Sequence, residues 1–324
     1  KTVEGFAERA RRIRSLAREM GYRPNTAARA TAKGKFGAVG VLTRPQISTV
    51  QLVLNRGVYE ELAANDLLMT YAYITPAELT LPEQAPKLLR EMCVDGLIVH
   101  YAQDVPPEII EALSRQNVPL VWTNTVADHD CVYPDDRQAG RLGTETLIER
   151  GHTRIGHARY RQLPQYPDDD AHHYHVEDRK QGYCDAMQRA GLEPRVVTAP
   201  HLPMERRPQR EYWMDGLETH RDVTAWLCGT EVEAATIIHV AAALGRRVPE
   251  DLSVLAIAES ARQRAFGLPV STLNVPMRTV GREAVRMLLA KIDNPERTAT
   301  SRAIPFTFSP SSTHSIAPPN SSNK

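Results

Sequence analysis

Residues 139–158, AGRLGTETLIERGHTRIGHA, contain the alternation that decides the fold. Ala139–Arg150 has the pattern of an amphipathic helix, and Ile155–Ala158 is a short apolar run typical of a buried strand. A helix that leads within a few residues into a buried strand is typical of parallel sheets covered by helices. This unit therefore predicts an α/β protein.

The same alternation extends from Gly37 to the carboxy-terminal region. Strands are predicted at Ala38–Leu42, Leu68–Tyr73, Gly96–Val99, Leu120–Trp122, Ile155–Ala158, Val196–Thr198, Ala225–Cys228 and Ser253–Ile257. Helices are predicted at Gln51–Asn65, Pro82–Met92, Pro107–Gln116, Ala139–Arg150, Arg179–Ala190, Glu205–Thr219, Val232–Leu244 and Val280–Ile292. These strands fit either one large sheet or two smaller ones, and the polar stretch Arg161–Asp178 marks a boundary between two halves.

The amino-terminal region has a different character. Glu8–Met20 predicts a helix that ends at Gly21, and Asn25–Ala32 predicts a second, short helix. From Lys1 to Lys35 there are ten basic residues against three acidic ones, which leaves 30 basic and 36 acidic residues in the remainder. A basic arm on a mildly acidic body is typical of a protein that meets phosphates at one end, although a solvated basic helix gives the same count.

Composition argues against several other classes. No apolar run approaches the roughly 20 residues of a membrane helix, and the charged start is unlike a signal peptide, so we expect a cytoplasmic protein without a membrane partner. The four cysteines are far apart, which favours buried thiols over a disulfide or zinc site. We find neither a glycine-rich phosphate loop nor a nucleophile elbow, and therefore expect no enzyme activity and no cofactor.

A histidine- and aspartate-rich stretch leaves one alternative open. His172, His173 and His175 follow Asp168–Asp170, and such side chains suit divalent metal ions. The stretch lacks regular periodicity, however, and we interpret it as a solvated loop rather than a metal site.

Many segments resemble the lactose-repressor (LacI/GalR) family of transcriptional regulators, in order and at matching spacing. They are Leu16–Arg29, Gly40–Gly57, Val94–Ile98, Val118–Val121, Asp135–Asp136, Leu147–Gly156, Asp178–Tyr183, Val248–Val254 and Ser311–Thr313. Each segment is weak alone, but together they cover essentially the whole chain.

The resemblance implies a two-lobed periplasmic-binding-protein-like fold, with two parallel sheets flanked by helices and an amino-terminal helical hinge remnant. Residues 1–36 would hold the last helix of the DNA-binding domain and the hinge helix. Residues 37–158 with 276–302 would form the first lobe, residues 159–275 with 303–313 the second, and residues 314–324 a disordered tail. The recognition helix of the family's helix-turn-helix would lie outside this sequence, which we interpret as a fragment.

The resemblance also implies an effector site between the lobes. Arg179 is the principal candidate, because its planar fork can grip hydroxyls or a carboxylate, although it can also be an exposed helix-start arginine. Asp135 would lie near the effector or cap the following helix. Asn124 would bind hydroxyls, and Trp122 would line the site or pack inside the sheet. Ser48 and Val50 stand where relatives contact the ligand.

Two positions depart from the family pattern in the second lobe. Thr230 and Glu231 stand where relatives carry an Asn-Asp pair, and Ala258 stands where they carry an acid. These departures remove any expectation of one particular hexose.

The resemblance makes the hinge a DNA contact. The residues that would contact DNA are Tyr22, Arg23, Asn25, Ala28, Arg29 and Thr31. Thr31 replaces the leucine that relatives push between base pairs, and threonine is a poor wedge.

We therefore predict a homodimeric DNA-binding regulator, most simply a repressor, that binds operator DNA and a sugar or related metabolite. A solute-binding protein of a transport system and an enzyme on the same scaffold are the alternatives.

Overall fold

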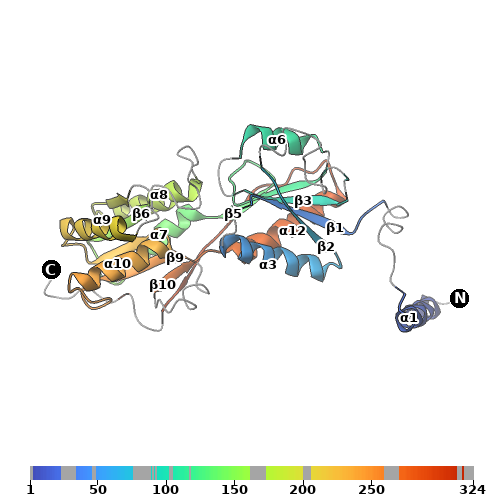
Figure 1. Cartoon of the computed structure of the whole chain (residues 1–324), viewed down its shortest axis with the longest axis horizontal. Coiled ribbons are helices and arrows are strands. Elements are labelled where there is room, and N and C mark those ends of the chain that lie inside the picture. The colour runs from blue at the N-terminus through green and yellow to red at the C-terminus, as the bar shows by residue number, and fades with distance from the viewer. Residues whose placement is uncertain are drawn as a thin grey trace.

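The computed structural model describes residues 3–22, 34–45, 49–75, 89, 91, 93–101, 105–116, 118–160, 173–199, 206–258, 270–311 and 316. Within these residues the strands form two separate six-stranded sheets, each in its own lobe (Figure 1). The expectation of two sheets flanked by helices is confirmed.

The first lobe is built on a wholly parallel sheet of order β11-β5-β4-β3-β1-β2. Its strands are β1 (Ala38–Thr43), β2 (Leu68–Tyr73), β3 (Gly96–His100), β4 (Leu120–Thr123), β5 (Cys131–Pro134) and β11 (Arg302–Ile304). Because alternate side chains of a strand point to opposite faces, β1 contributes Val39 and Val41 to one core and Ala38 and Leu42 to the other. Helices α3 (Thr49–Ala64) and α12 (Met277–Asp293) cover the first face, and α6 (Pro107–Ser114) covers the second.

The second lobe repeats this plan with the order β12-β10-β9-β8-β6-β7, in which only β12 is antiparallel to its neighbour. Its strands are β6 (Ile155–Tyr160), β7 (Arg195–Ala199), β8 (Ala225–Cys228), β9 (Ser253–Ala258), β10 (Ser271–Asn274) and β12 (Thr307–Ser309). Helices α7 (Asp136–Ile148) and α8 (Tyr174–Arg189) cover one face, and α9 (Arg206–Thr219) and α10 (Glu231–Ala243) cover the other.

Three connections join the lobes in the described chain, and they correct the expected boundaries. The chain leaves the first sheet after β5, returns between β10 and α12, and leaves again between β11 and β12. The prediction that the first lobe extends to residue 158 is wrong, because α7 and β6 belong to the second lobe. The last crossing also lies later than residue 302, since β11 continues to Ile304.

Each lobe contains one helix pair in unusually close contact. A Cβ added to Gly57 of α3 would lie 2.0 Å from the carbonyl oxygen of Arg278 in α12. A Cβ added to Gly140 of α7 would lie 2.0 Å from the carbonyl oxygen of Arg179 in α8. A Cβ added to Gly182 of α8 would lie 2.0 Å from the carbonyl oxygen of Arg137 in α7. Glycine is therefore required where these backbones meet.

Several predicted elements have different limits or lie outside the described residues. Helix α1 runs from Val3 to Glu19, so it begins earlier than the predicted Glu8, and α8 begins at Tyr174 rather than at Arg179. A strand is predicted from Ser309 onwards, whereas β12 ends at Ser309. The predicted hinge helix 25–32, nearly all of helix 82–92 and nearly all of the tail 314–324 lie outside the described residues.

Candidate functional site

Arg179 lies in the second turn of α8 and is held by two hydrogen bonds. Its Nε donates to Asp136 Oδ1 at 2.7 Å, and its Nη1 donates to the carbonyl oxygen of Gly229 at 2.5 Å. The residue is only 7% exposed, so it is not a solvated helix-start arginine. Burial raises the pKa of Asp136, and the adjacent guanidinium opposes that rise. Arg179 is thus fixed at the edge where β8 ends.

Of the two adjacent aspartates, Asp136 rather than Asp135 contacts this arginine. Asp135 is the N-cap of α7, and its Oδ1 accepts from the backbone N–H of Gln138 at 2.9 Å. The capping role that the sequence left open for Asp135 is therefore the one observed. Asp136 points inward instead and is 2% exposed.

Thr230 and a neighbouring glutamate close the other side of the site. Thr230 is the N-cap of α10, and its Oγ1 accepts from the backbone N–H of Val232 at 3.1 Å. The buried carboxyl here belongs to Glu233, which receives the Thr230 hydroxyl hydrogen bond and the backbone N–H of Tyr160 at 3.0 Å. Glu231, which the sequence favoured, lies in the same turn but does not line the pocket. The spacing Thr-x-x-Glu of a capping box is the sequence signal for Glu233.

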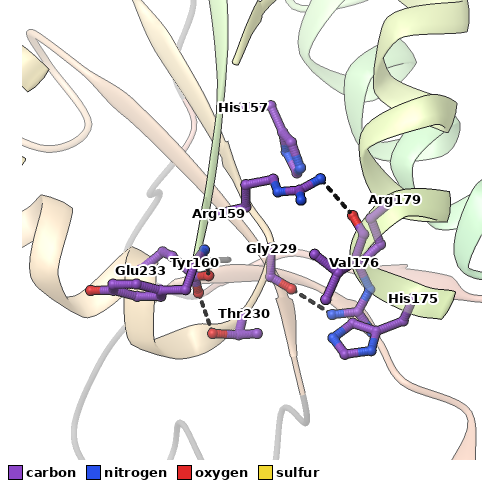
Figure 2. A pocket seen from close by; sticks show the side chains of 9 residues that line it. All are labelled: His157, Arg159, Tyr160, His175, Val176, Arg179, Gly229, Thr230 and Glu233. Atoms are coloured by element: carbon purple, nitrogen blue, oxygen red, sulfur yellow. Dashed lines mark hydrogen bonds between the residues drawn. The ribbon is translucent and has the colours of Figure 1, made fainter. Parts of the chain in front are cut away.

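These groups line a small pocket in the second lobe, which Figure 2 shows from close by. Its lining residues are His157, Arg159, Tyr160, His175, Val176, Arg179, Gly229, Thr230 and Glu233. They come from the end of β6, the start of α8 and the segment after β8, which is where parallel strands present ligand sites. The cavity has a volume of about 10 Å³, so it accepts a group about the size of one water.

A larger cavity of about 450 Å³ lies beside the start of α8 and is lined by both lobes. The first lobe contributes Trp122, Asn124 and nearby residues, and the second contributes His173 and Tyr174. Asn124 Nδ2 lies 3.0 Å from His173 Nε2, which joins the two sides. The cavity is large enough for a small organic molecule. Trp122 lines this cavity and also packs against the core of its own lobe.

The histidines at the start of α8 are half-buried, and their pKa values are lowered. Burial lowers the pKa of His173 to about 3, and burial also lowers the pKa of His175 well below its usual value. His173 is the N-cap of α8 and contacts His175 through their Nδ1 atoms. The prediction that these two side chains lie in a solvated loop is therefore wrong, because they lie at the start of α8. The described residues contain no cluster of metal-binding side chains, and Asp168–Asp170 and His172 lie outside them.

Val50, a predicted site residue of the first lobe, lines neither of these two cavities. Val50 packs against the core beneath α3, and Ser48 lies outside the described residues. Next to Val50, Gln51 is buried and donates from Nε2 to Thr43 Oγ1 at 2.7 Å.

Of the residues predicted to contact DNA, only Tyr22 is described, and it is 65% exposed. Arg23, Asn25, Ala28, Arg29 and Thr31 lie outside the described residues. None of the helices in the described part of the chain is both long enough and apolar enough to span a bilayer.

Comparison with known proteins gives consistent results. A family described as a periplasmic binding protein-like domain matches residues 144–312. The HTH-type transcriptional regulator IpsA of Corynebacterium glutamicum is 26% identical over 305 residues, covering 89% of this chain and 84% of that protein. The HTH-type transcriptional regulator GalR of Escherichia coli is 28% identical over 289 residues, covering 87% and 80%.

Solved structures share the fold at lower identity. A regulatory protein of the LacI family from Chloroflexus aggregans superposes with a TM-score of 0.69 at 20% identity, covering 86% of this chain and 98% of that one. A LacI family transcriptional regulator from Enterococcus faecium with bound ribose superposes with a TM-score of 0.64 at 21% identity, covering 87% and 100%.

Proposed function

Because the chain belongs to the periplasmic-binding-protein-like family and its relatives are LacI-family regulators, we propose that it is a DNA-binding transcriptional regulator controlled by a small effector. The observation that carries this proposal is the cavity between the lobes, which lies beside the buried Arg179 pocket. A ligand that contacts both lobes can bias their relative position, and this is how a binding event reaches a distant DNA-binding end.

The effector class that fits the site is a sugar or related metabolite. The 450 Å³ cavity combines the rings of Trp122 and Tyr174 with the amide of Asn124. Aromatic faces pack against the apolar faces of sugar rings, and amides bond to hydroxyls. Among the relatives, one solved structure contains ribose and another is a regulator in complex with cellobiose.

The amino-terminal segment supplies the DNA contact in this proposal. On α1, Ile13, Leu16 and Met20 are exposed and lie close to one helical face, as expected for a helix that packs in a small DNA-binding domain. Tyr22 and the hinge residues Arg23, Asn25, Ala28, Arg29 and Thr31 would then contact DNA. A regulator of this type acts in the cytoplasm.

A second copy of the chain is the partner we propose for the outer side of the first lobe. Leu52 and Tyr59 are 59% and 62% exposed and lie two turns apart on α3. Tyr73 is exposed on β2, which is the edge strand of the same sheet. Exposed apolar and aromatic side chains on one helix and an adjacent edge strand favour a homodimer interface.

The proposal is tested by a thermal-shift screen of the full chain against sugars, nucleosides and small acids. We expect a sugar to raise the melting temperature of the wild type, and Arg179→Ala to abolish that shift. Arg137→Ala is the matched control, because Arg137 pairs with Asp185 at the surface. A ligand shift that persists in Arg179→Ala would place the effector site elsewhere.

A further inference from the structure

The second-lobe pocket contains two buried polar atoms that have no hydrogen-bond partner among the described residues. They are Nε2 of His157 and Nε of Arg159. Both side chains line the pocket in which Arg179 lies (Figure 2). A buried polar atom without a partner is costly, and such exceptions point to a group that binds there.

The free atom of His157 can only accept a hydrogen bond. The Nδ1 of His157 lies 3.0 Å from the carbonyl oxygen of Leu227, and since a carbonyl only accepts, Nδ1 carries the proton. Burial lowers the pKa of this side chain to about 3, so it is neutral and Nε2 has a free lone pair. The ring is stacked on Tyr183, with 5.3 Å between centroids, which fixes its orientation.

The free atom of Arg159 can only donate. Its Nη1 donates to the carbonyl oxygen of Val176 at 3.2 Å and to Glu177 Oε2 at 3.1 Å, whereas its Nε–H is buried without a partner among the described residues. The positive charge of Arg159 is balanced by Glu177, as that of Arg179 is balanced by Asp136. The pocket therefore has no excess cation that would require an anionic ligand.

Several other polar groups of the pocket are bonded to one another. Glu233 accepts from the Tyr160 backbone and from Thr230, and Arg179 donates to Gly229. Among the described residues, the fully buried atoms of this pocket that lack a partner are thus one donor and one acceptor, beside a volume of about 10 Å³. A hydroxyl fits this remainder, because it donates once, accepts from a second direction and has the size of a water. A carboxylate cannot donate, an ammonium cannot accept, and a methyl can do neither.

We propose that this pocket binds the terminal hydroxyl of a neutral sugar, which donates to His157 Nε2 and accepts from Arg159 Nε. The hydroxyl is a terminal one because a volume of about 10 Å³ has room for a single heavy atom. This inference rests on the proposed function and names the part of the effector that the second lobe reads.

Isothermal titration calorimetry with pairs of sugars tests the inference. The probes are D-glucose, D-galactose and D-ribose, each compared with its 6-deoxy or 5-deoxy counterpart and with its 2-deoxy counterpart. We expect the full chain to bind at least one parent sugar and to bind its terminal deoxy form about 100-fold or more weakly, because a site that bonds a hydroxyl is left with unpaired groups.

Two conservative variants test whether His157 and Arg159 cause the weaker binding of the terminal deoxy sugar. His157→Asn keeps a donor near the Nδ1 position and removes the acceptor, and Arg159→Lys keeps the charge and removes the Nε–H. Each should weaken the parent sugar about 10-fold or more and change the terminal deoxy form less than about 2-fold. His129→Asn and Arg189→Lys repeat the same substitutions at exposed sites and should change neither.

The possible results separate the inference from the proposed function. Equal binding of a parent sugar and its terminal deoxy form overturns the inference and leaves the regulator intact. Lower melting temperatures of both ligand-free variants, with discrimination unchanged, would mean that the pocket holds a structural water, which also overturns it. If no sugar binds the wild type, both this inference and the proposed sugar class of effector are wrong. The proposed regulator function is then tested separately by DNA binding.

Discussion

At the scale of single residues, the Asp136–Arg179 ion pair is the most consequential contact of the site. Its side chains are only 1% and 9% exposed, so neither charge is stabilised by water. Such a pair contributes little net stability relative to apolar residues, but loss of one member leaves the other buried and unpaired. The site therefore depends on both members being present.

We expect Arg179→Met to lower the free energy of unfolding by about 3 kcal/mol, since Asp136 then lacks its partner. The double variant Asp136→Asn, Arg179→Met should lose less than the two single variants combined. Urea unfolding measures these values. Arg137→Met, which breaks an exposed pair with Asp185, should cost under about 1 kcal/mol, and a similar cost for Arg179→Met would contradict this account.

Four histidines whose pKa is lowered give a second prediction at this scale. Burial lowers the pKa of His100 to about 4 and of His157 and His173 to about 3, and lowers the pKa of His175 well below its usual value. The folded state keeps them neutral, whereas the unfolded chain takes up protons below about pH 6.5. Stability should therefore fall as the pH drops from about 7 to about 5.5, by up to about 1.4 kcal/mol per histidine per pH unit.

Thermal or urea unfolding across this pH range checks the prediction. His100→Asn should reduce the pH dependence, whereas His129→Asn should not, because the His129 side chain is 64% exposed. Equal pH profiles for the wild type and His100→Asn would show that His100 is not held neutral.

At this scale, the sequence does not predict which of two adjacent residues takes which role. The sequence predicts Arg179 as the principal residue of the site, and the structure buries its side chain against the second-lobe pocket. The pattern could not decide which of Asp135 and Asp136 caps the helix, because a one-residue shift turns a side chain from the helix end to the interior. In the sequence, His157 and Arg159 are indistinguishable from ordinary strand residues. Only the structure shows that they line a pocket together with residues of α8.

At the scale of helices and strands, the glycine contacts between paired helices position the site. Gly140 allows α7 to approach the backbone of α8 at Arg179 itself. The helix that supplies Asp136 and the helix that supplies Arg179 are thereby held in close contact. The geometry of the pocket thus depends on a residue that has no side chain.

We expect Gly140→Ala to destabilise the second lobe by about 2 kcal/mol or more, because its Cβ would meet the Arg179 carbonyl oxygen at 2.0 Å. Effector binding should weaken at the same time. The control is Gly216→Ala in α9, whose Cβ would meet Val197 at an ordinary 3.6 Å and should stabilise by about 0.5–1 kcal/mol. Differential scanning calorimetry compares the two variants, and equal melting temperatures would contradict the close-contact argument.

The elements that sequence reasoning missed share one property, their length. Strands β5 and β10 have four residues each, and β11 and β12 have three each. Short strands give a weak pattern, and of the four-residue strands only β4 and β8 were predicted. The start of α8 was placed too late because Tyr174–Asp178 reads as polar loop, although His173 caps the helix. Longer helices and central strands have enough turns or alternate positions to be recognised.

At the scale of the whole molecule, the lobes are distinct because each has its own sheet and its own cores. The sequence could not locate the first crossing, since the helix α7 follows β5 directly and continues the strand–helix alternation without a break. Only pairing between distant segments, such as β11 with β5, reveals which lobe a strand joins.

The proposed dimer gives a prediction at this scale. Tyr59→Asp should convert a dimer to a monomer or weaken it about 100-fold, because a charge would be buried at the centre of an apolar contact. Sedimentation velocity measures the change. Gln188→Asp, at an exposed position of α8 in the other lobe, should leave the assembly unchanged. A wild-type chain that is monomeric at all concentrations would contradict the interface.

The central claim is that a small molecule between the lobes controls DNA affinity, and its most direct measurement is reciprocal linkage. A duplex selected by the full chain from a random pool and the sugar found in the thermal-shift screen are each titrated with and without the other. The account predicts that sugar changes the duplex Kd by about 5-fold or more, and that duplex changes the sugar Kd by the same factor. Two affinities that are each independent of the other ligand would contradict it.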